Sequence, residues 1–393
     1  MSECDLLCVN IERDQLRDVA QHFEGLDDPR SSVNLRHPLV SVMVLALMGI
    51  LAGSSGPTAI AEWARLNTAR LGDVLDLPNG IPRKDVFRRV LSMLPPAAFQ
   101  ACFVSWLQTL RARATAATGI TQPVFAVDGK TLRRSHNRAQ GLGAMHSVSL
   151  WAADFGLTLG QVATDEKSNE ITAIPELLKR IDLQGAIVTI DAMGTQTAIA
   201  TDIVAGGADF VLALKGNQNK LYEAVVAHID EQMQTDFAEC GAQRLITPEE
   251  SHGRKEQRIV IQMPAPQTLP GFGRWSGLKT IAVVRLMSQR DGKETYASRY
   301  FISSLELDVK RLAHAVRSHW SIENTCHWSL DITYREDESR IREAKLRENF
   351  AWLNRFTLSL LKQYTNGHSL AMQRRRCGWN FDVLLEVLNA QRT

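Results

Sequence analysis

The chain has 393 residues, a length that suggests two or three domains rather than one compact unit. Hydrophobic residues make up 45% of it and charged residues 22%, and this composition excludes a mainly disordered chain. The formal net charge of +2 permits nucleic-acid binding without arguing for it, so such a function must be argued from local clusters of basic residues.

The sequence carries no sign of export or of a membrane span. Its first residues lack the basic segment and apolar core of a signal peptide. The most apolar stretch, residues 38–53, is shorter than the roughly 20 residues that a span needs, so we expect a buried helix there. The six cysteines form no CxxC pair, which favours reduced thiols over a disulfide or zinc scaffold. We therefore expect a cytoplasmic protein without a membrane segment.

The first part of the chain, residues 1–117, is predicted to be an all-helical domain. Apolar residues recur there at helical spacing, without a strand signal. The expected helices cover 14–25, 39–51, 56–68, a segment that begins at Pro82, and 97–115. Lys84 and Arg88 lie one turn apart on the fourth helix and are candidate DNA contacts, because such a helix can enter the major groove. A solvated helix face is the alternative.

The sequence pattern changes at residue 118, where short apolar runs begin to alternate with helical patterns. The expected strands are 124–129, a hairpin of 144–154 and 157–164, then 186–190 and 209–214. The expected helices are 170–181, 197–206 and 221–233. This alternation predicts an α/β sheet in residues 118–238.

The remainder divides into a β-rich and a helical part. Residues 239–308 contain strand-like runs at 258–263, 279–287 and 294–305, separated by Pro, Gly and polar stretches, and they predict an antiparallel insertion. Residues 309–393 read as helical and are expected to complete the core of the α/β domain.

Acidic residues stand at the ends of the apolar elements. Asp128 ends AVD and Asp191 ends IVTID, both at predicted strands, and Glu323 lies on a predicted helix. Ligands in α/β sheets bind at the carboxyl ends of strands, where two aspartates and a glutamate can share a pair of divalent cations. A turn or helix cap is the alternative for each aspartate, and a solvated helix position for the glutamate.

Basic and amide side chains accompany these acids. Lys130, Arg133 and Arg134 follow Asp128, and Lys215 and Asn217 follow the strand at 209–214. Cations beside paired carboxylates suit a phosphate backbone. We therefore expect these five residues to contact DNA.

Seven segments in order carry a resemblance to a known family. They are AVDGKTLRRS, EKSNEITAIPELL, VTIDAMGTQ, FVLALKGNQ, HGRKEQR, RYFISSL and HWSIENTCHWSLDITYREDESRIR. Together they resemble the H-repeat-associated, ISAs-type insertion-sequence transposases of the DDE superfamily. DPR at 28–30 and GIPRKDVFRRV at 80–90 are similar to that family's associated helical domain. The resemblance covers nearly the whole chain.

The resemblance implies a mixed-sheet RNase H-like core with a β-insertion between the second Asp and the Glu. It makes Asp128, Asp191 and Glu323 the catalytic and metal-binding triad, with two Mg²⁺ per site and Mn²⁺ as a substitute. The implied activity is binding of the element's terminal inverted repeats, metal-dependent cleavage there, and strand transfer into target DNA. The implied partners are double-stranded DNA and further copies of the chain.

We expect three further residues to contact DNA. They are Arg254 in HGRKEQR, and His319 and Trp320 shortly before Glu323. Related transposases with a β-insertion often have Tyr, Arg and Lys at −7, −4 and +7 from the Glu, where this chain has Val316, His319 and Leu330. Roles that depend on those side chains are therefore not expected here.

Alternatives remain for both the metal and the function. His319, Glu323 and His327 follow one another at intervals of four residues, with Cys326 nearby, and on one helix face they could hold a transition metal. The chain could also be a degenerate relative that binds DNA without cutting, or an RNase H-like nuclease without strand transfer.

Overall fold

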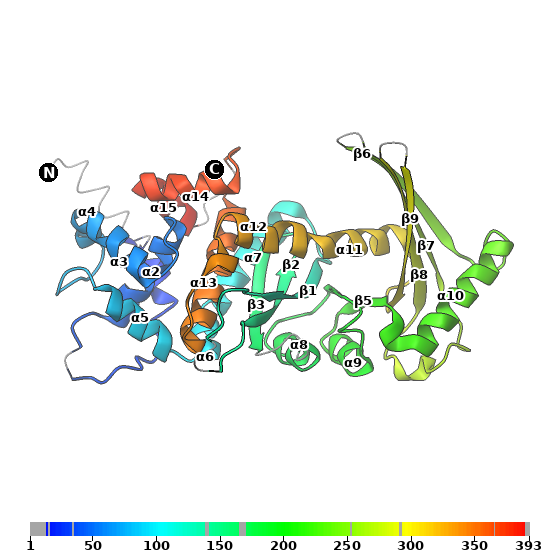
Figure 1. Ribbon diagram of the computed structural model, residues 1–393, viewed down its shortest axis with the longest axis horizontal. Helices are drawn as coiled ribbons and strands as arrows, with labels where there is room; N and C mark the ends of the chain where they lie inside the picture. The colour runs from blue at the N-terminus through cyan, green and yellow to red at the C-terminus, as the bar shows by residue number, and fades with distance from the viewer. Residues whose placement is uncertain are drawn as a thin grey trace.

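The computed structural model describes residues 13, 14, 16–33, 35–137, 141–164, 170–251, 254–290, 293–364 and 366–389. The molecule is elongated, with the N-terminal helices at one end and four long strands at the other (Figure 1). The middle of the molecule holds the remaining strands and the helices that cover them.

The N-terminal region is helical, as its pattern indicates. Residues 16–21 are helical, and the following helices are α2 (Leu39–Leu51), α3 (Pro57–Leu66), α4 (Thr68–Val74), α5 (Lys84–Met93), α6 (Pro96–Ala101) and α7 (Val104–Thr118). All residues of α2 except Val40 are buried, so the most apolar stretch is a core helix. In the described part of the chain no single helix could cross a membrane, although the bent pair 84–93 and 96–118 passes by length and composition.

A nine-stranded mixed sheet forms the spine of the molecule. Its strands are β1 (Val124–Thr131), β2 (His146–Ala152), β3 (Leu157–Thr164), β4 (Ile187–Ile190), β5 (Asp209–Leu214), β6 (Gln243–Ser251), β7 (Arg254–Pro264), β8 (Thr280–Arg290) and β9 (Lys293–Ser303). The order is β3-β2-β1-β4-β5-β9-β8-β7-β6. β1, β4 and β5 run parallel and the other neighbours antiparallel. The predicted α/β class with an RNase H-like mixed sheet is confirmed.

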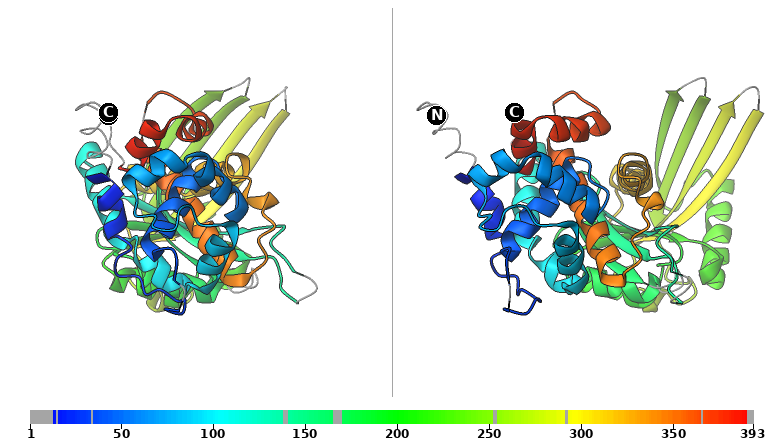
Figure 2. Two further views of the ribbon diagram at one scale, coloured as in Figure 1. Left: turned by 90° about the vertical axis from the view of Figure 1, so that its left-hand side faces the viewer. Right: turned by 60° about the vertical axis from the view of Figure 1, so that its left-hand side comes forward.

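Helices cover both faces of the inner strands. α8 (Glu170–Leu178) packs on β2 and β3, and α9 (Thr197–Ala205) packs on β5. α11 (Val309–Ser321) crosses β1, β4 and β5 and also contacts β6 and β7 (Figure 2). Val124, Ile187 and Val211 pack with Leu312 and Val316 of α11 in a core of their own. This packing fixes the helix across the parallel strands.

The β-rich segment is continuous with the inner sheet. β9 pairs with β5, so the four outer strands extend one sheet rather than forming a separate one. α10 (Asn219–Gln234) leads into them and contacts β9. β6 was not expected, because QRLITPEES lacks a run of apolar residues.

The C-terminal helices return to the N-terminal ones. After α11 come the π-helical turn η5 (Ile322–His327), α12 (Trp328–Ile332), η6 (Glu336–Glu338), α13 (Ala344–Gln363), α14 (Leu370–Trp379) and α15 (Phe381–Leu388). α13 contacts α2 and α5, and α14 and α15 contact α2. The buried guanidinium of Arg374 donates to the Ile50 carbonyl oxygen at 3.0 and 3.2 Å. The domain boundaries at 118, 239 and 309 stay predictions.

The acidic run at 336–338 is typical of an exposed segment, and for Glu336 that expectation is wrong. Its side chain is 1% exposed, and its Oε1 accepts from Nη1 of the fully buried Arg355 at 3.0 Å. Asn354 donates to the same oxygen at 3.4 Å. The local sequence pattern indicated an exposed side chain. Its partner Arg355 lies on α13, a helix that begins eight residues later in the chain, and so is not part of that local pattern.

Glu336→Ala should lower the free energy of unfolding by about 3–5 kcal/mol, because it leaves the buried Arg355 guanidinium without a counter-charge. Urea unfolding followed by circular dichroism measures the change. Glu338→Ala is the matched control, since Glu338 is exposed, and should stay within about 0.5 kcal/mol of wild type. Equal stability of all three proteins would show that the buried pair is not needed.

Candidate active site

Two aspartates lie side by side where the parallel pairing of β1 with β4 ends, Asp128 within β1 and Asp191 directly after β4. β1 pairs in parallel with β4, and the register aligns the residues that directly precede Asp128 and Asp191. Successive side chains of a strand point to opposite faces. Val124 and Ile187, which share the phase of the two aspartates, pack against α11. Both carboxylates therefore lie on the face of the sheet that α11 covers.

The third carboxylate comes from the end of α11. His319, in its last turn, forms a hydrogen bond of 3.0 Å between its Nδ1 and the Thr189 Oγ1 of β4, which ties the helix to the strand. Glu323 follows one turn later in η5 and is exposed. Asp191, His319 and Glu323 line one cavity of about 200 Å³. The structure thus brings Glu323 to the edge that carries the aspartates.

Asp191 also closes the turn after β4. Its Oδ1 accepts from the backbone N–H groups of Met193 at 3.0 Å and Gly194 at 3.4 Å. The turn-forming role considered from the sequence is therefore present. Among the described residues no hydrogen bond to Oδ2 is formed, so one carboxylate oxygen stays free for a ligand.

The electrostatics of Asp128 reflect its crowded position. Burial raises the pKa of Asp128 to about 7. A hydrogen bond from the Gly129 backbone opposes this rise in pKa, whereas the negative charges of Glu323, Asp191 and Glu170 add to it. The acids at this edge therefore lie close enough to repel one another.

A buried histidine stands beside Asp128 without neutralising it. His327 Nδ1 is 3.6 Å from Asp128 Oδ2. Burial, together with the smaller effect of the charges of Arg355 and Lys130, lowers the pKa of His327 to about 3, so the ring is neutral. Its Nε2 is buried without a hydrogen-bond partner among the described residues. The negative charge of the aspartates is therefore not compensated from this side.

The carboxylates suit a hard divalent cation by their chemistry. Mg²⁺ takes oxygen ligands, and uncompensated carboxylates attract it. Within the described ranges, however, no three His, Cys, Asp or Glu side chains stand close enough around one point to hold an ion. The alternative considered from the sequence, a transition-metal site of His319, Glu323 and His327, is not among the groups that the described residues form, and the segment from Ile322 to His327 is a π-helical turn.

The basic residues after Asp128 are partly engaged within the protein. Lys130 is buried, and its Nζ lies 2.6 Å from Asp331 Oδ1 and 3.1 Å from Asp337 Oδ1. Arg133 is 81% exposed and pairs with Asp337 at 3.2 Å. Arg134 is exposed. Exposure leaves both arginines accessible to DNA, whereas Lys130 is held inside the protein.

The other expected DNA contacts are spread over the molecule. Lys215 lines the cavity of Asp191 and Glu323. Asn217 is exposed but donates its side-chain amide to the Ala192 carbonyl oxygen. Arg254 begins β7 at the far end of the outer strands, and its side chain lies outside the described part of the structure. Lys84 is exposed on α5, and Arg88 there pairs with Glu343 at 2.7 Å.

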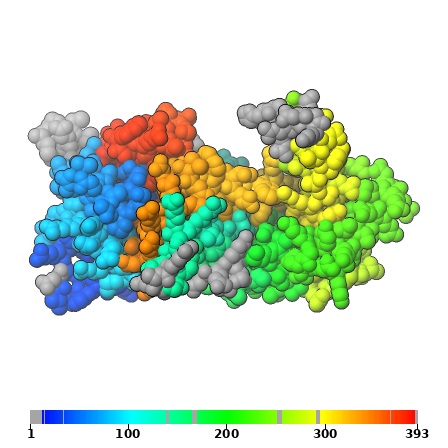
Figure 3. Space-filling view, viewed as in Figure 1, coloured from blue at the N-terminus to red at the C-terminus, as the bar shows by residue number. Residues whose placement is uncertain are grey.

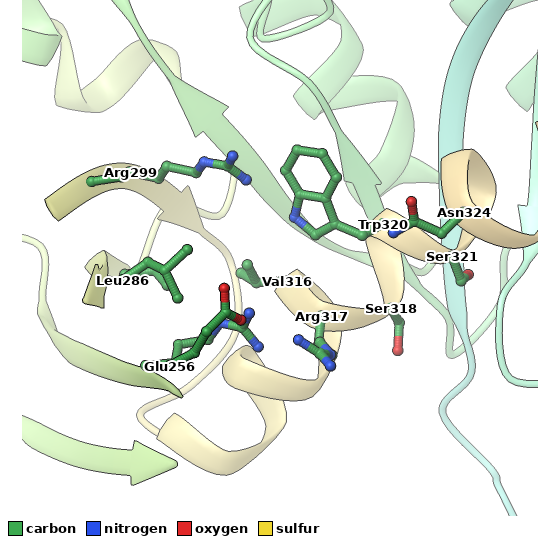
Figure 4. Close-up of a pocket in the computed structure, with 12 residues that line it drawn as sticks. Glu256, Leu286, Arg299, Val316, Arg317, Ser318, Trp320, Ser321 and Asn324 are labelled. Atoms are coloured by element: carbon green, nitrogen blue, oxygen red, sulfur yellow. The ribbon is translucent and has the colours of Figure 1, made fainter. Parts of the chain in front are cut away.

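A larger cavity of about 530 Å³ adjoins the carboxylate edge, between α11 and the outer strands (Figure 4). Arg299 of β9 reaches toward Trp320, with its guanidinium 4.2 Å from the centre of the indole ring (Figure 4). Both residues also line the cavity of Asp191 and Glu323. On the face seen in Figure 3, α11 forms the floor of a hollow between the C-terminal helices and β8 and β9.

Arg299 was missed from the sequence. It is the first residue of RYFISSL, a segment that served as a strand prediction and as part of the family resemblance, without a functional residue being assigned in it. Nothing local indicated that its side chain stacks on Trp320, because the contact depends on the pairing of β9 with β5 beneath α11.

Two family models match the chain. The model described as "Transposase DDE domain" covers residues 120–361, and the one described as "DDE_Tnp_1-associated" covers residues 20–107.

Curated relatives match over most of their length. "H repeat-associated putative transposase YhhI" of Escherichia coli K12 is 33% identical over 387 residues, covering 95% of this chain and 98% of that protein. "Putative transposase YncI" of Escherichia coli O157:H7 is 35% identical over 380 residues, 95% of each chain. An "Uncharacterized protein in dhlA 3'region" of Xanthobacter autotrophicus is 37% identical over 287 residues, 73% of this chain and 94% of that one.

The raised pKa of Asp128 predicts a stability that falls with pH. Between its unfolded pKa of about 4 and its folded pKa of about 7, the folded state binds more protons than the unfolded state, so stability decreases as pH rises through this window. Asp128→Asn mimics the protonated form. Its free energy of unfolding should therefore rise relative to that of wild type from pH 4 to pH 7, by up to a few kcal/mol, and the difference should stay constant above pH 7.

Differential scanning calorimetry without divalent metal measures this difference. Asp337→Asn is a control acid, since Asp337 pairs with Lys130 and Arg133 rather than with other carboxylates. A constant difference in stability between wild type and Asp128→Asn across this pH range would contradict a raised pKa of Asp128.

Proposed function

The chain belongs to the family of transposases with a DDE domain, and from this membership we propose that it binds the ends of its own mobile element, cuts there and joins the freed 3′-hydroxyl to target DNA. One observation carries the proposal. The register of β1 with β4 places Asp128 and Asp191 on the face that α11 covers, and Glu323 follows that helix in η5. Burial, together with the smaller effect of the neighbouring charges, raises the pKa of Asp128.

In the proposed reaction these three residues would come together as the catalytic and metal-binding group, since within the described residues no three such side chains surround one point. Bound Mg²⁺, or Mn²⁺ in its place, would supply the Lewis acidity that activates the attacking water or hydroxyl and stabilises the leaving oxygen. We infer two ions per site from the family resemblance. The neutral His327 lies beside Asp128 and leaves the charge of the carboxylates for these cations.

Other side chains would position the DNA strand. Trp320, held under the Arg299 guanidinium, presents an aromatic ring on which a base can stack. Lys215 lies in the same cavity as Asp191 and Glu323 and can contact a phosphate. His319 is partly buried and bonded to Thr189, which supports a role in placing Glu323 more than a role at the DNA surface. Arg133 and Arg134 are exposed beside the strand of Asp128.

Transposition joins two ends of an element, so we propose that the chain acts as a dimer or larger assembly on DNA. A nuclease of the same fold without strand transfer is the second candidate, because the same carboxylates would serve hydrolysis alone. Joined products in a reaction with Mg²⁺, the DNA that flanks the gene and a target plasmid would separate the two. Binding without any cleavage would instead indicate a degenerate relative.

We predict that Asp191→Asn lowers Mg²⁺-dependent cleavage by at least about 100-fold while DNA binding stays near wild type. Asn retains an oxygen that accepts from Met193 and Gly194, so the turn is kept and only the charge is lost. Asp191→Ala should give the same loss. Gel analysis of a labelled terminal duplex measures cleavage, and near-normal cutting by the Asn variant would remove Asp191 from the site.

We also predict that Glu323→Gln abolishes strand transfer and weakens Mn²⁺ binding, whereas Asp331→Asn still cuts. Asp331 is the appropriate comparison because it lies eight residues further on and pairs with Lys130 instead of lining the cavity of Asp191. Cleavage of one duplex by both variants, with Mn²⁺ titration followed by electron paramagnetic resonance, provides the readouts. The opposite ranking of the two variants would mean that Asp331 is the third carboxylate.

A further inference from the structure

A third cavity, of about 640 Å³, lies in the N-terminal helical region apart from the carboxylates. Its walls are the segment 30–37, residues near 80 and one side of α5. Four arginines line it, against Asp85 as the single acid: Arg30, Arg36, Arg83 and Arg89. The whole chain carries a net charge of only +2, so this groove concentrates positive charge.

The four arginines differ in their pairing. Arg30 is fixed by Asp28, which accepts from its Nε at 2.8 Å and its Nη2 at 2.6 Å, and Nη2 also donates to the His37 carbonyl oxygen at 2.8 Å. Arg36, Arg83 and Arg89 are exposed, and none forms an ion pair with a residue in the described part of the chain. Three guanidinium groups are thus available to an external anion.

The groove uses a different side of α5 from the one expected to contact DNA. Arg83, Val86, Arg89 and Met93 line it, at the spacing of three to four residues that defines one helix face. Lys84 and Arg88 do not line it, and Arg88 is occupied by Glu343. The basic residues of GIPRKDVFRRV therefore separate into two faces.

Exposed apolar side chains accompany the arginines. Val33 is 73% exposed, and Leu35 and Met93 are also among the exposed large apolar residues, and all three line the groove. Proteins that bind the minor groove combine arginines with such apolar side chains. Several separate cations also match a ligand whose negative charge repeats regularly, as phosphates do about every 3.4 Å along one strand of a duplex.

We propose that this groove binds the sugar–phosphate backbone of duplex DNA through Arg36, Arg83 and Arg89. The site rests on the proposed function, which supplies DNA as the substrate, and adds a contact remote from the carboxylates. It provides affinity and positioning rather than chemistry, because phosphate contacts fix a protein on DNA without reading its sequence.

The test is a salt titration of DNA binding by the full-length protein. Fluorescence anisotropy with a labelled duplex from the end of the element, in EDTA to prevent cleavage, gives the binding constant at each salt concentration. Arg83→Ala/Arg89→Ala should lower the slope of log K against log salt by about 2 and weaken binding on the order of 10- to 100-fold at 0.1 M salt. The loss should be similar on an unrelated duplex.

Two further double variants complete the experiment. Lys179→Ala/Arg180→Ala removes two exposed positive charges outside the groove and should bind like wild type. Lys84→Ala/Arg88→Ala tests the other face of α5 and should lose less affinity than the groove variant. Arg83→Lys/Arg89→Lys, which keeps the charge, should retain most of the salt dependence.

The proposal is overturned if the groove variant keeps the wild-type affinity and slope, or if the Lys84/Arg88 variant loses as much. It is also overturned if the groove variant changes only the oligomeric mass in light scattering, which would make the groove a protein interface. Cleavage assays distinguish this failure from failure of the proposed function. A wild-type protein that binds through the groove but never cuts DNA in Mg²⁺ would contradict the function and leave the groove in place.

Discussion

Burial of carboxylates beside one another is the constraint on which the centre of this molecule depends. Asp128 and Asp191 are brought together by strand pairing, and the same sheet carries the apolar residues that hold α11 and thereby Glu323. The cost appears as the raised pKa of Asp128. Hydrophobic burial in the large core that surrounds the site offsets the free-energy cost of this arrangement.

Much of the fold could be predicted from local pattern. The apolar runs at 186–190 and 209–214 and the hairpin at 144–164 correspond to β4, β5 and the pair β2 and β3. The spacing of apolar residues is sufficient to predict buried strands and amphipathic helices. β6 did not, because its alternation is carried by polar residues whose pairing with β7 stabilises the strand.

The candidate site was only partly accessible from the sequence. The positions of Asp128 and Asp191 at buried strands could be recognised as candidate site positions from the sequence, since the carboxyl edge of a parallel sheet is a general place for ligands. The burial of Lys130 between Asp331 and Asp337, and of Glu336 against Arg355, depends on partners far along the chain. Likewise, only the neighbours of α5 decide which of its basic faces is free.

The π-helical turn at residues 322–327 has a consequence for the length of this segment. A helix advances by about 100° per residue, so one additional residue shifts the phase of everything that follows. Up to Ser321 the buried side of the helix is set by the parallel strands, whereas from Trp328 onward it is set by a different core that includes Leu330. The π-helical turn supplies the change of helical phase between these two buried sides. Loss of one residue between Glu323 and His327 would rotate Leu330 out of its core or Glu323 away from the sheet, which makes this stretch intolerant of deletion even where its side chains touch nothing.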